Sequence, residues 1–519
     1  MISFRYYHVS LKTQDLVYNR SMQVSKTDFI LFRECKKNVW LKIYRPDVFN
    51  AAKLSEFEKA IIETGNEVEL VARTLFPLGV LIEGRGAQAQ QKTQELLAAK
   101  TPILFQPEFL KDDFRAASDI LELKPDDTFN LYEVKATTDV DKKTHYHDLA
   151  FQVNLLSNCG LEISNAYVVH LNSEYVRQGE VNVNKLFTVA DVTETVKDLQ
   201  EDVAAQMQLA KAYLQQQEEP TGHCDCVYKG RSNHCATFAY SNPTVPEYGV
   251  HDISRIGSNR ARLQELIDVG IFELKDVYGR EDIFNTLSDP QRNQIEAHVF
   301  DKLLIDKYSI NGDLKSLVFP LYFLDYETFP AAIPRFDGFS PYQQIPFQYS
   351  LFMLDSPDSE LRHAEFLFSE NADPSREFLL SLQKDINAVG SIIVWNKKFE
   401  CKINEELAER NKDFKPFIDM VNDRVYDLMD IFVQQYYVDK NFKGRVSIKN
   451  VLPVLVPELS YKSLEIQEGG TASQKWNKIH NGVSSMEKEK IITDLKEYCK
   501  LDTLAMVKIW EYLYKLTNV

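Results

Sequence analysis

Two groups of acidic residues in the sequence have the types and spacing of metal-binding sites. In the first group, Asp119 is followed by Glu133, and Lys135 lies two residues beyond Glu133. The second group is spread more widely along the chain and consists of Asp325, Glu327, Glu400 and Asp502. Carboxylates hold divalent cations, which activate water and offset the charge of a phosphate group, and burying them without a cation would be costly. The two groups therefore indicate hydrolysis of phosphodiester bonds.

Two predicted strands position the first group. Residues 113–123 and 129–138 have strand-like composition and are joined by a turn-like segment. Glu133 and Lys135 leave the same face of the second strand because side chains alternate along a strand. Asp119 on the neighbouring strand could then share a cation with Glu133, while Lys135 lies beside the attacking water and the phosphate. The plainer alternative is a surface hairpin with an ordinary Glu-x-Lys pair.

Helix-like segments flank these strands. Residues 57–80 include Glu69, and residues 147–161 place Gln152 on a helix that returns beside the strands. The order of the motifs resembles the RecB-like branch of the P-D-(D/E)-X-K nucleases, which includes CRISPR-associated members. The resemblance implies a restriction-endonuclease-like fold for this part of the chain. Many relatives carry histidine at the position of Glu69, so the resemblance makes Glu69 a further metal ligand.

The same resemblance assigns roles to the other residues of the first group. It implies that Asp119 and Glu133 bind a metal ion and that Lys135 is catalytic. Gln152 matches the glutamine of the branch's Gln-x-x-x-Tyr motif and is assigned to the catalytic set. Leu156 stands where that motif has its tyrosine, so this part of the pattern is degenerate.

Four cysteines could form a separate metal site, although one lies far upstream of the others: Cys35, Cys224, Cys226 and Cys235. Thiolates this close would be free to oxidise unless they bind something, and four of them suit a [4Fe–4S] cluster or a zinc ion. The arrangement resembles the iron–sulfur staple of several RecB-like nucleases, and we favour that interpretation. Because the Cys-x-Cys-x8-Cys spacing departs from the usual one, zinc with His223 or His234 is the main alternative, and a loop of unligated cysteines is the third. The remaining cysteines are interpreted as isolated packing residues: Cys159, Cys401 and Cys499.

The second acidic group begins on an apolar strand. This strand is predicted within the segment 317–329 and ends in Asp325 and Glu327, which share one face because they are two residues apart. A second apolar run leads into Asn396 and Glu400. Their four-residue separation places both on one side if a helix begins there.

A helix completes the second group. Residues 486–513 have a strongly helical pattern, in which Tyr498 and Asp502 are four residues apart. The four acids of this group could meet around two cations about 3.5–4 Å apart. Tyr498 could orient the attacking water or help to deprotonate it.

The ordered motifs of the second group resemble the DEDD exonucleases of the RNase H-like fold, specifically the subgroup with a tyrosine. The segment from Asn396 to Glu400 matches the Asn-x-x-Phe-Asp motif of that family, with Glu400 in place of aspartate. The resemblance implies 3′–5′ exonuclease activity, metal ligation by the four acids, a catalytic Tyr498 and a substrate-binding Asn396. The longer glutamate side chain would change the geometry of one metal site.

Three regions of the chain separate by pattern. Residues 1–245 mix helical and strand periods, residues 246–312 are largely helical, and strands return in residues 313–519. We therefore predict an α/β chain of the α+β multidomain type, with a restriction-endonuclease-like domain, a helical bridge and an RNase H-like domain. In the third region, segments 426–432 and 447–461 also resemble a bacterial family of unknown function that commonly follows a RecB-like half.

The middle region contains two predicted helices in residues 253–277, with Gly270 and Ile271 at the turn between them. The pattern resembles a helix-hairpin-helix, which presents backbone N–H groups and a helix N-terminus to phosphates. The alternative, which we favour, is a helical bridge that positions the two catalytic units.

Composition limits the class of protein. The chain has 519 residues, 44% of them hydrophobic, which suits two or three domains with real cores. Its net charge of −16 argues against a broadly basic surface for nucleic acid, although carboxylate-rich metal sites contribute to that charge. No apolar run approaches the roughly 20 residues of a membrane helix, and the N-terminus lacks a signal-peptide core. Seven cysteines do not make a disulfide framework, so we expect a cytoplasmic protein with no membrane partner.

The leading hypothesis is a nuclease with two centres that depends on Mg²⁺ or Mn²⁺, since all-oxygen ligands favour hard cations. Its expected partner is nucleic acid, DNA in preference to RNA. One rival is a module that grips nucleic-acid ends while one or both centres are inactive, and Leu156 and Glu400 favour it. Another is a subunit of a repair or defence assembly with a separate helicase, because the sequence has no Walker-type phosphate loop.

Overall fold

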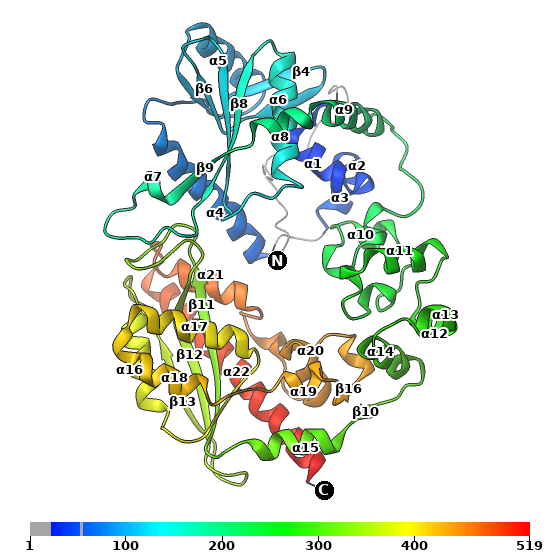
Figure 1. The fold of residues 1–519 in the computed structure, drawn as a ribbon, viewed down its shortest axis with the longest axis vertical. Coiled ribbons are helices and arrows are strands. Elements are labelled where there is room, and N and C mark those ends of the chain that lie inside the picture. Colours follow the sequence, from blue (N-terminus) through cyan, green and yellow to red (C-terminus); the bar gives the residue numbers. More distant parts are fainter. Residues whose placement is uncertain (1–21, 52–54, 519) are drawn as a thin grey trace. The chain divides into compact units, whose positions relative to one another are not determined.

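The computed structural model describes residues 22–51 and 55–518, which divide into two compact units. Unit 1 consists of the described residues up to Val227, Asn233–Pro243 and Ala332–Tyr342. Unit 2 consists of Tyr228–Ser232, Thr244–Ala331 and the described residues from Gln343 onward. Both units combine helices with β-sheet (Figure 1), so the predicted α+β multidomain organisation is confirmed at this coarse level.

Unit 1 is built on a six-stranded sheet in the order β2-β3-β6-β7-β8-β9 and a three-stranded sheet in the order β1-β5-β4. The strands of the large sheet are β2 (Val80–Leu81), β3 (Ile103–Phe105), β6 (Ile120–Leu123), β7 (Phe129–Lys135), β8 (Ile163–Leu171) and β9 (Phe187–Asp191). Those of the small sheet are β1 (Val24–Ser25), β4 (Glu108–Lys111) and β5 (Phe114–Ala117). Strand β7 lies between β6 and β8, and its last five residues are buried, which is typical of a strand covered on both faces.

The helices of unit 1 are α1 (Lys26–Glu34), α2 (Lys36–Tyr44), α3 (Pro46–Phe49), α4 (Glu56–Ala72), α5 (Ala87–Ala98), α6 (His145–Asn158), α7 (Val183–Leu186), α8 (Thr193–Asp198), α9 (Gln200–Leu214) and α10 (Phe238–Ser241). Helix α6 packs against α1, α9 and the strands, and the ring of its Phe151 lies 5.1 Å from that of Phe29 on α1. Helix α4 starts at Ser55, whose side chain exchanges hydrogen bonds with Glu58 in a capping box.

The strand predicted over residues 113–123 is in fact two strands. β5 pairs with β1 and β4 in the small sheet, whereas β6 pairs with β3 and β7 in the large one. The chain crosses between the sheets at Ser118 and Asp119, so a single strand was the wrong prediction. Periodicity could not reveal the crossing, because both halves have the composition of buried strands. Asp119 therefore lies in a connection, beside β7, rather than on a strand.

Unit 2 contains a five-stranded sheet in the order β13-β12-β11-β14-β15. Its strands are β11 (Leu321–Pro330), β12 (Gln344–Leu354), β13 (Arg362–Leu367), β14 (Ser391–Val394) and β15 (Val425–Asp427). The first three strands in chain order pair antiparallel, while β14 runs parallel to both β11 and β15. A short antiparallel pair, β10 (Leu304–Ile305) and β16 (Tyr437–Val438), lies elsewhere in this unit.

Helices cover both faces of the five-stranded sheet: α16 (Ser375–Asp385), α17 (Lys397–Arg410) and α18 (Lys415–Asn422) on one face, and α21 (Gly469–Lys478) and α22 (Ser485–Thr517) on the other. Tyr322, Leu324 and Tyr326 of β11 belong to the core under the first set. Phe323, between them, faces α22 and lies 6.0 Å from the ring of Trp510. By this alternation Asp325 and Glu327 also face α22. β11 does not end at Glu327, as predicted, but continues past a bulge to Pro330.

The region predicted to be a helical bridge, residues 246–312, is largely helical and lies within unit 2. The helices that follow Thr244 are α11 (Arg260–Asp268), α12 (Leu274–Tyr278), α13 (Glu281–Phe284), α14 (Asp289–Val299) and α15 (Lys307–Ser316), and unit 2 also holds α19 (Asp430–Val433) and α20 (Ile448–Leu455). Gly270 joins α11 to α12 with a φ of 75°, which glycine adopts at little cost. The predicted turn between two helices is therefore confirmed.

None of the helices in the described parts of the chain is long and apolar enough to cross a membrane.

Candidate metal centres

The acids of the second group converge in unit 2. Asp325 and Glu327 come from β11, Glu400 from the first turn of α17, and Asp502 from the middle of α22. Glu327, Glu400 and Asp502 are buried, with exposed fractions of 6%, 4% and 7%. The carboxylates of Asp325 and Glu327 and the Cys499 thiol have ligand atoms within 4.8 Å of one another. Unit 2 therefore gathers, from three elements, donor atoms that could surround a cation.

The electrostatics of this cluster are those of a site with an excess of negative charge. Burial, followed by repulsion from neighbouring carboxylates, raises the pKa of Asp325, Glu327 and Glu400 well above the ordinary values. Burial also raises the pKa of Asp502, against the opposing effect of hydrogen bonds from Tyr461 and Tyr498. One oxygen of Glu400, Oε2, is buried without a hydrogen-bond partner among the described residues. Buried carboxylates in this condition need protons or cations.

Asn396 takes a structural position beside the cluster. It is the N-cap of α17, and its side-chain oxygen accepts a hydrogen bond from the N–H of Phe399 at 3.3 Å. This cap starts the helix where the sequence analysis expected it, and it directs Glu400 toward Asp325 and Glu327. Asp427, at the end of β15, accepts a hydrogen bond from the N–H of Lys397 at 2.8 Å and fixes the same turn.

Three residues of this centre were not predicted from the sequence. Tyr461 donates a hydrogen bond to Asp502, and Lys449 donates one to the hydroxyl of Tyr498 at 3.2 Å. Cys499 was interpreted as an isolated packing residue, yet its sulfur lies 4.0 Å from Oδ2 of Asp325. Its place immediately after Tyr498 was the available signal. For Lys449 and Tyr461 the only signal was the resemblance of the segment 447–461 to a family of unknown function.

The acids of the first group meet in unit 1 in a different electrostatic setting. Glu133 and Lys135 come from β7, and Lys135 donates hydrogen bonds to Glu133 at 2.9 Å and to Asp148 of α6 at 2.7 Å. Gln152 of α6 donates to Glu133 at 2.8 Å and to Asp148 at 3.0 Å. The predicted proximity of Glu133, Lys135 and Gln152 is thus observed, and Asp148 joins them.

Asp119 and Glu69 complete this network through an amide. Gln106 donates from its side chain to Asp119 at 3.1 Å and to Glu69 at 2.5 Å. The other oxygen of Asp119 accepts a hydrogen bond from the N–H of Val134 at 2.8 Å. Glu69 also pairs with Arg73 at 2.5 Å.

Lys26, at the start of α1, supplies a positive charge that the sequence analysis missed. Its Nζ lies 2.7 Å from Oε1 of Glu133. Burial, with repulsion from Asp119 and Asp148, raises the pKa of Glu133 to about 7 despite the two lysines. Burial also acts to raise the pKa of Asp148, but Lys135 and Lys26 outweigh it and hold that pKa below its usual range. Lys26 and Lys135 thus offset part of the negative charge of the acids in unit 1. The acids of the unit 2 centre have no such salt bridges among the described residues.

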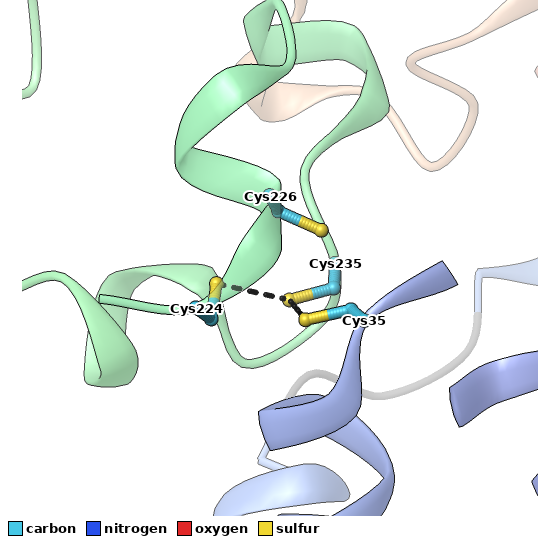
Figure 2. A group of neighbouring side chains, drawn as sticks. All are labelled: Cys35, Cys224, Cys226 and Cys235. Atoms are coloured by element: carbon cyan, nitrogen blue, oxygen red, sulfur yellow. Dashed lines mark hydrogen bonds between the residues drawn. The ribbon is translucent and has the colours of Figure 1, made fainter. Parts of the chain in front are cut away.

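The four predicted cysteine ligands converge in unit 1 (Figure 2): Cys35, Cys224, Cys226 and Cys235. All four are buried and none forms a disulfide. The sulfur of Cys235 lies 3.8 Å from that of Cys35 and 3.9 Å from that of Cys224, and all four sulfurs lie within 4.8 Å of one another. The amide of Asn242 donates to the sulfur of Cys224 at 3.2 Å, which favours a thiolate. These residues could therefore bind a metal.

The two histidines considered as alternative ligands do not belong to this group in the described residues. His223 hydrogen-bonds the side chain of Asn242 at 3.0 Å, and the ring of His234 stacks on Phe238. Cys35 ends α1, whereas Cys224, Cys226 and Cys235 follow α9. The cluster thus joins the first helices of unit 1 to its last segments.

We expect replacement of Cys35 by serine to release most of the metal bound by the four cysteines, because one of four ligands is lost from a buried site. The melting temperature should fall by at least several degrees. Metal analysis together with visible absorption measures both the amount and the kind of metal. Cys159→Ser is the matched control, and equal metal content in the two variants would contradict the assignment.

The raised carboxyl pKa values of unit 2 generate a pH prediction. A carboxyl whose pKa is higher in the folded than in the unfolded chain favours folding below the unfolded pKa, and this contribution is lost as the pH rises through the folded pKa. Mn²⁺ replaces the missing protons, so it should raise the melting temperature more at about pH 8 than at about pH 5.5.

Melting curves with and without Mn²⁺ check this expectation. In Asp325→Asn the pH-dependent part of the shift should shrink, since one acid is removed. A shift that is equal at both pH values would refute it.

The chain is similar to a protein family and to two proteins whose descriptions name no activity. Residues 322–447, most of which lie in unit 2, match a family described as a domain of unknown function, DUF2779. The chain is 26% identical over 303 residues to the uncharacterized protein UU173 of Ureaplasma parvum, a match that covers 54% of this chain and 42% of that protein. It is also 26% identical over 212 residues to the uncharacterized protein MG366 of Mycoplasma genitalium, covering 37% of this chain and 32% of that protein. The chain thus spans less than half the length of either relative.

Proposed function

We propose that the chain is a metal-dependent nuclease whose principal centre is the acidic cluster of unit 2. One observation carries this proposal: four carboxylates from β11, α17 and α22 converge in a mostly buried site, and one buried oxygen of Glu400 has no protein partner among the described residues. Mg²⁺ or Mn²⁺ would supply the missing charge and activate water for attack on a phosphodiester.

The topology of unit 2 supports an RNase H-like assignment. Counted along the chain, its sheet has the order 3-2-1-4-5, with three antiparallel strands followed by two parallel ones. The first strand carries Asp325 and Glu327, and the C-terminal helix that covers this face carries Tyr498 and Asp502. This is the placement that the resemblance to DEDD exonucleases implies, and it supports 3′–5′ exonuclease action. As the substrate we propose DNA in preference to RNA.

The residues of the unit 2 centre would have different roles, because their side chains differ in chemistry. Asp325, Glu327 and Asp502 would hold the cation, with Glu400 as a longer fourth ligand. Burial, reinforced by Asp502 and Glu327, raises the pKa of Tyr498, so its phenol stays protonated and orients water rather than removing a proton from it. Cys499 would add a soft sulfur to an otherwise hard ligand set, which favours Mn²⁺ over Mg²⁺.

For unit 1 we propose a RecB-like nuclease centre with Asp119 and Glu133 as ligands and Lys135 as the catalytic lysine. A second candidate role is to grip nucleic acid without cutting it, and a specific contact favours it. Lys26 pairs with Glu133 at 2.7 Å and takes an oxygen that a metal would need. In that role unit 1 would serve unit 2 or a separate helicase of a repair or defence assembly.

For the cysteine cluster we propose a structural metal. Four sulfurs at about 2.3 Å from one tetrahedral zinc ion lie about 3.8 Å apart, close to the 3.8 and 3.9 Å found here. A [4Fe–4S] cluster binds each thiolate to a different iron and spaces the sulfurs more widely. The sulfur separations therefore favour zinc over the iron–sulfur cluster expected from the sequence.

We expect Asp325→Asn and Asp502→Asn to lower the rate of DNA degradation from a 3′ end by more than about 100-fold, because even outer partners of a metal are worth 10- to 100-fold. The assay follows a 5′-labelled single strand in the presence of Mn²⁺. Glu497→Gln, on the exposed side of α22, is the matched control and should keep full activity.

Glu133→Gln in unit 1 separates the two centres. If unit 2 is the exonuclease, this variant shortens the labelled strand at the wild-type rate. Shortening that persists in Asp325→Asn and stops in Glu133→Gln would move the activity to unit 1. No shortening by the wild-type protein on DNA or RNA would leave end binding as the function.

A further inference from the structure

Lys449 is held against the unit 2 centre by four contacts. Its Nζ donates hydrogen bonds to the hydroxyl of Tyr498 at 3.2 Å and to the carbonyl of Gln467 at 2.6 Å. The same Nζ lies 5.5 Å and 5.2 Å from the ring centroids of Tyr461 and Tyr498. A lysine confined in this way has given up the rotational freedom of its long side chain, which a solvated surface lysine would keep.

The positive charge of Lys449 acts on the acids of the centre. Against the larger effect of burial, it lowers the pKa of Asp325, Glu327 and Asp502. Lys449 lies on helix α20, and its hydrogen-bond partners lie on the segment before α21 and on α22, so one side chain joins three elements around the cluster.

The first residue of α21 lies on the same side of the cluster. A Cβ placed on Gly469 would lie 3.9 Å from both Oε2 of Glu327 and the hydroxyl of Tyr498. The backbone that follows Gln467 therefore passes close to the carboxylates without covering them by a side chain. Lys449 anchors this backbone through the Gln467 carbonyl, and its charge lies at the edge of the centre.

The hydrogen bonds of the Tyr498 hydroxyl show what its contact with Lys449 does. A tyrosine hydroxyl has one proton and two acceptor positions. Lys449 donates to one acceptor position, and the hydroxyl interacts with the carboxylate of Asp502. With its proton directed at Asp502, the hydroxyl keeps one acceptor position for a water molecule. Lys449 thus fixes the direction in which Tyr498 can hold that water.

We propose that Lys449 is a positioning residue for Tyr498 and supplies the fixed positive charge that meets a phosphate oxygen of the substrate at the unit 2 centre. The proposal rests on the proposed nuclease function of that centre. It adds to the acidic set a basic residue from a different helix, and it identifies the ligand of that residue as a phosphate group of a nucleic-acid strand.

The test uses the full chain with Lys449→Met, which keeps most of the apolar stem but removes the charge, and Lys449→Arg, which keeps the charge. With Mn²⁺ and a 5′-labelled single strand of DNA, we expect Lys449→Met to lower kcat by about 10- to 100-fold, the range for outer partners of a metal site. Lys449→Arg should recover part of that loss. Lys462→Met, an exposed lysine of the neighbouring segment, is the control and should match the wild type.

Calorimetric titration with Mn²⁺ in the absence of nucleic acid gives a readout that does not depend on activity. Removing a positive charge beside the acids should make Lys449→Met bind Mn²⁺ several-fold more tightly than the wild type. Unchanged or weaker Mn²⁺ binding would overturn the proposal, as would a kcat equal to that of the wild type. If the wild-type protein degrades no nucleic acid, the proposed function fails, and the titration still decides whether Lys449 acts on the acids.

Discussion

The alternation of side chains along β11 is the constraint on which unit 2 depends. Tyr322, Leu324 and Tyr326 lie in the core beneath α16, α17 and α18, so the intervening residues must face α22. Two of those residues are acids, and burying them brings a cost that hydrophobic packing on the other face must outweigh. The strand thus serves as a core element on one face and as the base of a polar site on the other.

The two acidic centres solve the problem of buried charge in opposite ways. In unit 1, Lys26 and Lys135 contact Glu133, and Lys135 also contacts Asp148, so salt bridges replace much of the lost solvation. Among the described residues of unit 2, the basic side chain that acts on Asp325, Glu327 and Asp502 is Lys449, which hydrogen-bonds Tyr498 rather than a carboxylate. The lysines offset part of the negative charge in the first arrangement, whereas the acids of the second have no salt bridge to a basic side chain among the described residues.

Sequence reasoning succeeded where the signal was local. The start of α17 at Asn396, the long α22 and the turn at Gly270 each follow from residues within a few positions of one another. It failed at the crossing between β5 and β6, because sheet membership depends on partners that are distant in the chain.

Residues brought in from afar were also missed. Lys26 lies 107 positions before Glu133, and Lys449 lies 49 positions before Tyr498. Nothing in the local pattern of either lysine differs from that of a surface residue. The cysteine group was found despite similar separations, because cysteine is rare enough in the chain to be noticed singly.

Helix α1 connects two of the candidate sites of unit 1. Lys26 at its first position touches Glu133, and Cys35, which ends it, belongs to the four-sulfur group. Nine helical residues form a rod about 13.5 Å long, too short and too regular to bend freely. One short helix therefore sets the spacing between a ligand of the four-sulfur group and a positive charge of the first acidic group.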